Sequence, residues 1–156
     1  MNIFYLDPDP RRAARFHNDR HVVKMILESA QMLSTACRKH GINEGYKSCF
    51  EHHPCTKWAS STKGNWRWLR DLAYELNDEY KYRFDNDDDH KSAVVISNLP
   101  EPNIEGSFTE PPRAMPDYCK KGLDSVNAYR KYYREEKDHL AEWTRRPVPK
   151  WFTQSS

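Results

Sequence analysis

Residues 17–37 read HNDRHVVKMILESAQMLSTAC, and the order of polar and apolar side chains in this stretch decides the fold class. At about 100° per residue on one continuous helix, six polar side chains fall in a stripe about 80° wide. The stripe consists of His17, His21, Lys24, Glu28, Gln31 and Thr35. Apolar residues occupy most of the remaining circumference, and a helix of that kind is usually buried. We therefore expect the stripe to face a cleft instead of open water.

The rest of the chain also favours helices, because it contains no sustained alternation of polar and apolar residues and no Asn-Gly hairpin signal. The expected helical segments are 10–39 with a break near 18–19, 54–83 with an interruption at 62–65, 90–98, and a final segment capped by Ser125. Residues 100–116 hold five of the ten prolines, which predicts a crossing loop. The sequence thus predicts an all-α protein, a compact single-domain bundle of about five helices spanning residues 1–156.

Composition narrows the class of protein. Aromatic residues reach 13% although hydrophobic residues make up only 37%, so we expect a core rich in aromatic side chains. The chain has no long apolar run and no basic segment at its start, so we expect no membrane segment and no signal peptide. The four cysteines form no CxxC pair, which favours the cytoplasm, or the host cytoplasm if a phage encodes the protein. Mildly basic regions, 1–84 and 118–156, flank an acidic segment, a distribution that permits a phosphate-binding surface.

The polar stripe carries the main candidates for catalysis. Glu28 is able to act as a general base or to stabilise positive charge, and Lys24 lies one turn away. His17 and His21 are able to donate to phosphate or to move protons. The alternative is a solvated helix face in which Lys24 and Glu28 form an ordinary i,i+4 pair. The two histidines also have zinc-site spacing, but Asn18 stands where a metalloprotease needs glutamate, so we expect no metal and no other cofactor.

Basic and aromatic side chains alternate in three segments, 57–58, 63–70 and 129–134. This pattern suits nucleic acids, because aromatic rings stack on bases while cations hold phosphates. We expect Trp66 and Tyr129 to serve the core at helical spacing. The surface candidates are then Trp68, Tyr132, Arg67, Arg130 and Arg134. A glycine-rich phosphate loop and a Gly-x-Ser-x-Gly elbow are both missing from the sequence, which disfavours a nucleotide-loop enzyme and an α/β-hydrolase.

Three segments carry a resemblance to a known family. They read DRHVVKMILESAQML at 19–33, HPCTKW at 53–58 and DEYKYR at 78–83, and LDP precedes them at 6–8. In this order they resemble the bacterial pyrimidine-dimer DNA glycosylases related to phage endonuclease V, over about the first 85 residues. The chain also resembles small uncharacterised phage proteins that share its opening and its Trp-Phe ending.

The resemblance implies an α-helical DNA-binding domain that flips a base and uses an N-terminal amine as nucleophile, assisted by a helix carboxylate. Lys24 and Glu28 match the family motif, and His21 stands where the family has arginine. Asn2 is too large for routine removal of Met1, so the amine would be that of Met1.

We therefore predict a DNA glycosylase that acts on a damaged or modified base, with AP lyase activity as an option. The catalytic candidates are Glu28, Lys24, Met1 and His21, and the substrate-binding candidates are His17, Arg20, Gln31, His53, Trp68, Arg67 and Arg130. The alternative is a non-enzymatic, phage-type protein that sequesters a nucleic acid or a nucleotide. A third hypothesis is an interaction module that docks partners through Trp151 and Phe152.

Overall fold

The computed structural model describes residues 1–154, and within that range it contains eight α-helices, one short 3-10 helix and no strand. The helices are α1 (Pro10–Phe16), α2 (Asp19–Lys39), α3 (Pro54–Ser61), α4 (Lys63–Arg83), α5 (Lys91–Ser97), α6 (Asp117–Lys120), α7 (Ser125–Glu136), η1 (the 3-10 helix, Asp138–Leu140) and α8 (Lys150–Thr153). The all-α prediction is confirmed, but the expected number of helices is too low. The helices α6, η1 and α8 span only three or four residues each, too few for a hydrophobic period to show.

The long helical segments break where the sequence supplies a cap. Asn18 accepts a hydrogen bond from a backbone N–H in the first turn of α2, and Thr62 does the same for α4. His17 therefore lies in the extended connection before α2, and the assumption of one continuous helix from this residue is wrong. The other ends agree with the sequence, since α2 ends at Lys39 and α4 ends at Arg83.

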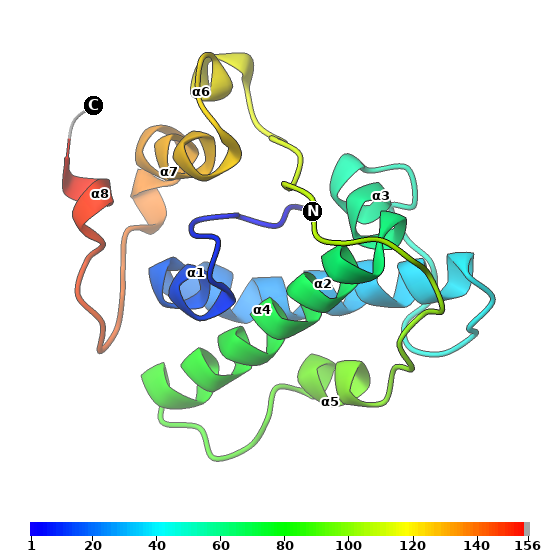
Figure 1. Cartoon of the computed structure of the whole chain (residues 1–156). Helices are drawn as coiled ribbons and strands as arrows, with labels where there is room; N and C mark the ends of the chain where they lie inside the picture. The colour runs from blue at the N-terminus through cyan, green and yellow to red at the C-terminus, as the bar shows by residue number, and fades with distance from the viewer. Residues whose placement is uncertain (155–156) are drawn as a thin grey trace.

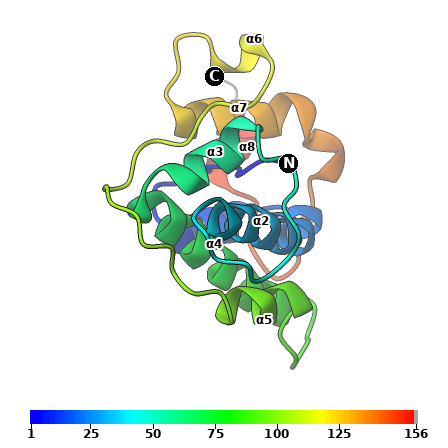
Figure 2. The ribbon, with the colours of Figure 1, turned by 90° about the vertical axis from the view of Figure 1, so that its right-hand side faces the viewer.

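The helix α2 lies at the centre of the molecule, where it packs against α3, α4 and α5, while α1 packs against α4 (Figure 1). The helices α6, α7 and α8 form a second layer. The N-terminal segment, residues 1–7, runs without regular secondary structure between this layer and α2 (Figure 1 and Figure 2). Within residues 1–154, no helix combines the length and the apolar character that crossing a bilayer demands.

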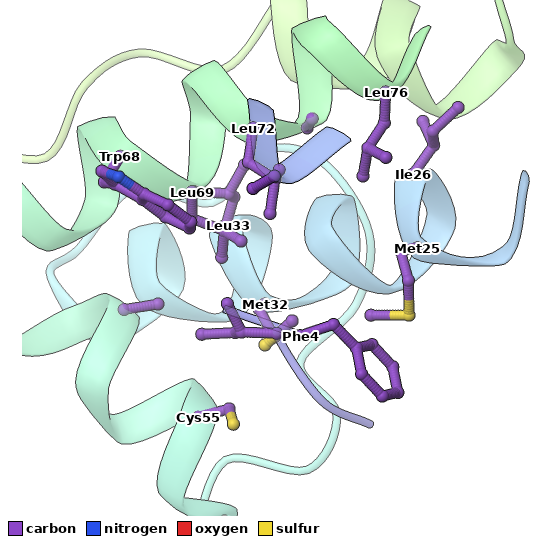
Figure 3. Packing of buried hydrophobic residues seen from close by; sticks show 14 of the residues in the cluster. Phe4, Met25, Ile26, Met32, Leu33, Cys55, Trp68, Leu69, Leu72 and Leu76 are labelled. Carbon is purple, nitrogen blue, oxygen red and sulfur yellow. The ribbon is translucent and has the colours of Figure 1, made fainter. Parts of the chain in front are cut away.

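The N-terminal segment contributes directly to the core. Residues 3–6 are buried together with side chains such as Leu33 of α2 and Leu69 of α4, and Figure 3 shows this packing around Phe4. Trp66 and Tyr129 are almost fully buried in the same cluster, as the sequence predicts. The buried path of residues 3–6 therefore fixes the position of Met1.

The C-terminal tail folds back onto the protein. Trp151 and Phe152 are half-buried and pack against the core. Arg134 of α7 donates a hydrogen bond to the Trp151 carbonyl at 3.1 Å, and the Trp151 ring meets the edge of the Phe16 ring at 5.7 Å. Trp151 and Phe152 are therefore not the freely exposed aromatic pair that the interaction-module hypothesis requires.

Candidate active site

The N-terminal amine of Met1 and the carboxylate of Glu28 form an ion pair. The amine nitrogen lies 3.0 Å from Oε1 of Glu28, and the two side chains are 2% and 10% exposed. Glu28 comes from the middle of α2, while Met1 reaches it at the start of the buried N-terminal segment. The fold thus places a primary amine beside a largely buried carboxylate.

Two further basic groups stand near this pair. Lys24 places Nζ 3.6 Å from Oε2 of Glu28, and its side chain is 61% exposed. His53, the N-cap of α3, accepts a hydrogen bond from the Cys55 N–H at Nδ1, over 3.1 Å. Burial and the Met1 ammonium lower the pKa of His53, and the charge of Glu28 opposes them. The site therefore combines an amine, a carboxylate, a neutral imidazole and a solvent-facing ammonium group.

The second carboxylate oxygen of Glu28 is left available. Oε2 is buried and accepts no hydrogen bond from any residue of the range 1–154, since Lys24 lies beyond hydrogen-bond distance. A buried carboxylate oxygen without a donor is costly. It is also suited to stabilise a positive charge that develops on a neighbouring atom.

Hydrogen bonds from distant parts of the chain fix the residue beside the amine. Asn2 accepts a hydrogen bond from the Tyr129 hydroxyl at Oδ1, over 2.9 Å, and donates from Nδ2 to the Ala114 carbonyl, also over 2.9 Å. Burial raises the pKa of Tyr129 well above its usual value, so the hydroxyl remains a donor. The sequence gives no signal for this role of Asn2, because its partners are 112 and 127 positions away and no local spacing connects them.

His17 and His21 lie in the core, so the expectation that they face a cleft is wrong. The Nδ1 atom of His17 lies 2.6 Å from the Ala13 carbonyl, which assigns the proton to this nitrogen. The His21 ring stacks on Phe4 with ring centroids 4.2 Å apart, and its Nδ1 lies 2.7 Å from the Tyr133 hydroxyl. Burial lowers the pKa of His17 to about 4 and that of His21 to about 2. Both rings are therefore neutral near pH 7, and His21 supports Phe4 in the N-terminal segment.

Three predicted DNA-binding side chains are engaged within the protein. Trp68 is buried and donates from Nε1 to a backbone carbonyl just before α1, so its predicted surface position is wrong. Arg67 forms an ion pair with Glu101 at 2.7 Å, although it is half-exposed. Arg130 pairs with Asp7 at 3.2 Å and also donates to a carbonyl of the N-terminal segment. Arg130 thus braces the segment that carries the amine.

Two other predicted residues remain accessible. Arg20 is exposed and lines, together with Lys24 and Glu142, an open depression of about 550 Å³. Gln31 is half-buried, one turn beyond Glu28. The structure brings together the amine, Glu28, Lys24 and the neighbouring imidazole of His53. Throughout residues 1–154, no three His, Cys, Asp or Glu side chains meet in a way that could hold a metal ion.

A primary amine beside a carboxylate is suited to nucleophilic attack on an electrophilic carbon and to Schiff-base formation. The fold and the site thus define an all-α protein whose N-terminal amine is paired with a carboxylate of its central helix. Residues 1–92 match the family model described as pyrimidine dimer DNA glycosylase. The match covers more than half of the 156 residues, so the chain belongs to this family, and the predicted resemblance is confirmed. Neither the curated proteins nor the solved structures contain a match to this chain.

Proposed function

We propose that the protein removes a pyrimidine base that is part of a dimer in DNA, with the Met1 amine as nucleophile and Glu28 as the assisting carboxylate. The family supports the substrate class. The observation that carries the assignment of residues is the 3.0 Å contact between the amine and Glu28. Both residues lie within the part of the chain that matches the family.

The first step is displacement of the base. Glu28 accepts a proton from the Met1 ammonium, which leaves a neutral amine with a free electron pair. This pair attacks C1′ of the deoxyribose while the bond from C1′ to the base nitrogen breaks, and the base leaves with the bonding electrons and takes the proton that Glu28 has accepted. Positive charge develops on the sugar as the bond breaks, and the Glu28 carboxylate, once it is ionised again, stabilises that charge.

The second step opens the sugar. The ring oxygen leaves C1′ with the bonding electrons and takes a proton, while the amine nitrogen forms a double bond to C1′ as a Schiff base. Loss of a C2′ proton then expels the 3′-phosphate and cuts the strand, which is the AP lyase reaction. Water hydrolyses the Schiff base and regenerates the amine. The neutral imidazole of His53, whose pKa responds to the Met1 ammonium and to Glu28, is a candidate to take the C2′ proton.

Glu28→Gln provides the principal test. Glutamine keeps the shape and the hydrogen-bonding capacity of the side chain but removes the charge. Release of the base from duplex DNA with a single defined pyrimidine dimer, measured after light has split the dimer and freed the detached base from its neighbour, should fall by about 100-fold or more, while affinity for the duplex changes little. If affinity and turnover fall together, Glu28 acts structurally and the proposed role is wrong.

Borohydride trapping identifies the nucleophile. The wild-type protein should form a covalent adduct with dimer-containing DNA, and mass spectrometry should locate the adduct on the N-terminal peptide with Met1 intact. Selective acetylation of the amine should abolish the adduct, whereas Lys24→Met should retain it. An adduct that survives acetylation and disappears in Lys24→Met would transfer the role to Lys24.

The same experiments separate this enzyme from the sequestering protein predicted as the alternative. A sequestering protein would bind the damaged duplex without releasing a base and without forming an adduct. Tight binding with neither product would overturn the proposed function.

A further inference from the structure

A second polar site lies further along α2 from Glu28. A cavity of about 250 Å³ is enclosed by the C-terminal half of α2, by residues 48–52 and by α3. The helices α2 and α3 pack against each other, as both ribbon views show (Figure 1 and Figure 2). The volume is below the range of about 300 to 1,000 Å³ typical of sites for complete drug-sized ligands. A single charged group with its immediate substituents is the appropriate size of ligand.

The charged side chains that line the cavity favour an anion. Arg38, Lys39 and Lys57 contribute three positive charges, and Glu51 contributes the one carboxylate. Glu51 lies 3.3 Å from Nε2 of His52, another lining residue. Neither lysine has an ion-pair partner within residues 1–154. The positive charge therefore exceeds the negative charge by two, even with His52 neutral.

A buried hydroxyl at the wall of the cavity also lacks a partner. Thr56 lies in the first turn of α3 and is 2% exposed, yet its Oγ1 atom has no hydrogen-bond partner. Most buried hydroxyls in proteins are paired, because an unpaired one lowers stability. The first turn of a helix also carries the positive end of the helix dipole, which favours a negative ligand. Thr56 thus carries, at the wall of this cavity, a hydroxyl that residues 1–154 leave without a partner, and a turn of its side chain is needed to bring Oγ1 to an acceptor oxygen.

The separation of the cavity from Glu28 can be compared with the spacing of phosphates along a DNA strand. Thr35, another lining residue, lies seven residues after Glu28 on α2, which is two turns and about 10 Å along the helix. Successive phosphates of one DNA strand are separated by about 3.4 Å along the duplex axis. The cavity is therefore close enough to Glu28 to take a backbone phosphate within a few nucleotides of the reacting sugar.

We propose that this cavity binds a backbone phosphate of the DNA strand, within a few nucleotides of the reacting sugar. Lys57 and Lys39 supply the charge, and the Thr56 hydroxyl supplies a hydrogen bond. The inference rests on the proposed function for the identity of the ligand. A free inorganic phosphate has the same chemistry, and the experiments below distinguish the two sources.

The first experiment measures the salt dependence of binding. The probe is a duplex with a tetrahydrofuran abasic site, which binds without forming a Schiff base. Lys57→Met retains the aliphatic stem of an exposed side chain and removes its charge. It should weaken binding by about eightfold or less at 0.1 M salt and reduce the slope of log Kd against log salt by about 0.9. Lys91→Met, at the exposed start of α5, is the matched control and should leave both quantities unchanged.

The second experiment locates the phosphate. Single neutral methylphosphonates are placed at successive positions of the strand that carries the abasic site. One or two neighbouring positions should weaken binding of the wild-type protein several-fold and have little effect on Lys57→Met. Thr56→Val should weaken binding at the same positions while the melting temperature of the free protein stays equal or rises, because the unpaired hydroxyl is removed.

The outcomes are separable from those of the proposed function, because base release by the wild-type protein is measured independently. If base release is normal but Lys57→Met keeps the wild-type salt slope, or every methylphosphonate affects both proteins equally, the cavity does not bind a DNA phosphate. Thermal stabilisation by millimolar inorganic phosphate, lost in Lys57→Met, together with a flat methylphosphonate scan would assign the cavity to free phosphate and overturn the proposal. If the cavity binds the strand as expected but no base is released, the proposed function alone fails.

Discussion

Acidification from pH 7 to pH 5 should destabilise the folded protein through two buried histidines. The pKa of His17 is lowered from 6.5 to about 4 and that of His21 from 6.5 to about 2, in each case mainly by burial. A group with a lower pKa in the folded state binds more protons when the chain unfolds, so its contribution to stability is complete above pH 6.5. That contribution is lost as the pH falls from 6.5 towards the pKa of the folded state.

The two pKa shifts also give the size of the expected loss of stability. A histidine whose pKa is 6.5 in the unfolded chain and 4 or lower in the folded chain loses roughly 2 kcal/mol of stability between pH 7 and pH 5. The two histidines together lose roughly 4 kcal/mol, which is an upper value because it takes both rings as unprotonated in the folded protein at pH 5. This is a large fraction of the roughly 5–15 kcal/mol that stabilises a typical domain. Urea unfolding at pH 7, 6 and 5, followed by the fluorescence of the five tryptophans, measures the loss.

A variant that cannot titrate tests the assignment to these rings. His21→Gln keeps a polar partner for the Tyr133 hydroxyl, and its free energy of unfolding should fall with pH about half as steeply as that of the wild type. His139→Gln, on an exposed residue, is the matched control and should retain the wild-type slope. A wild-type slope in both His21→Gln and His17→Gln would refute the reasoning and assign the acid sensitivity to other groups.

Two further substitutions test how the helices are held. Glu79→Gln should lower the free energy of unfolding in urea by about 1.5 to 3 kcal/mol, because the fully buried Arg83 guanidinium loses the carboxylate that lies 3.0 Å from it and keeps, within residues 1–154, only that of Asp19 at 3.2 Å. Gly64→Ala should lower the melting temperature despite the better helix propensity of alanine, since the added Cβ would lie 2.2 Å from the backbone nitrogen of Phe108. An unchanged or higher melting temperature would show that the loop at Phe108 moves away easily.

The helix boundaries that the sequence predicts are those with a local cause. His53 and Pro54 begin α3 because the imidazole caps the helix and proline fits its first position. Gly41, with φ of 87°, follows α2 in the left-handed region that glycine adopts without strain. The short helices α6 and α8 lack a side-chain cap, and their existence depends on packing that no short stretch of sequence reveals.

The sequence predicts some residues of the candidate site, but it does not predict the segment that packs against them. The helical period correctly places His21 and Glu28 on a common face of α2, but it does not tell which part of the chain covers that face. The N-terminal segment covers it, so Phe4 stacks on His21 and Met1 pairs with Glu28. A stripe that looks like the lining of a cleft is therefore closed in part by the protein itself.

The position of the amine depends on residues beyond the part of the chain that matches the family. The match ends at residue 92, whereas the Asn2 side chain is held by Tyr129 and by the Ala114 carbonyl, and Asp7 is held by Arg130. An unsupported chain terminus loses order readily, and a misplaced nucleophile lowers the rate steeply. The crossing loop and α7 thus act as the support that keeps the amine beside Glu28, and the site requires the second layer of helices as much as it requires α2.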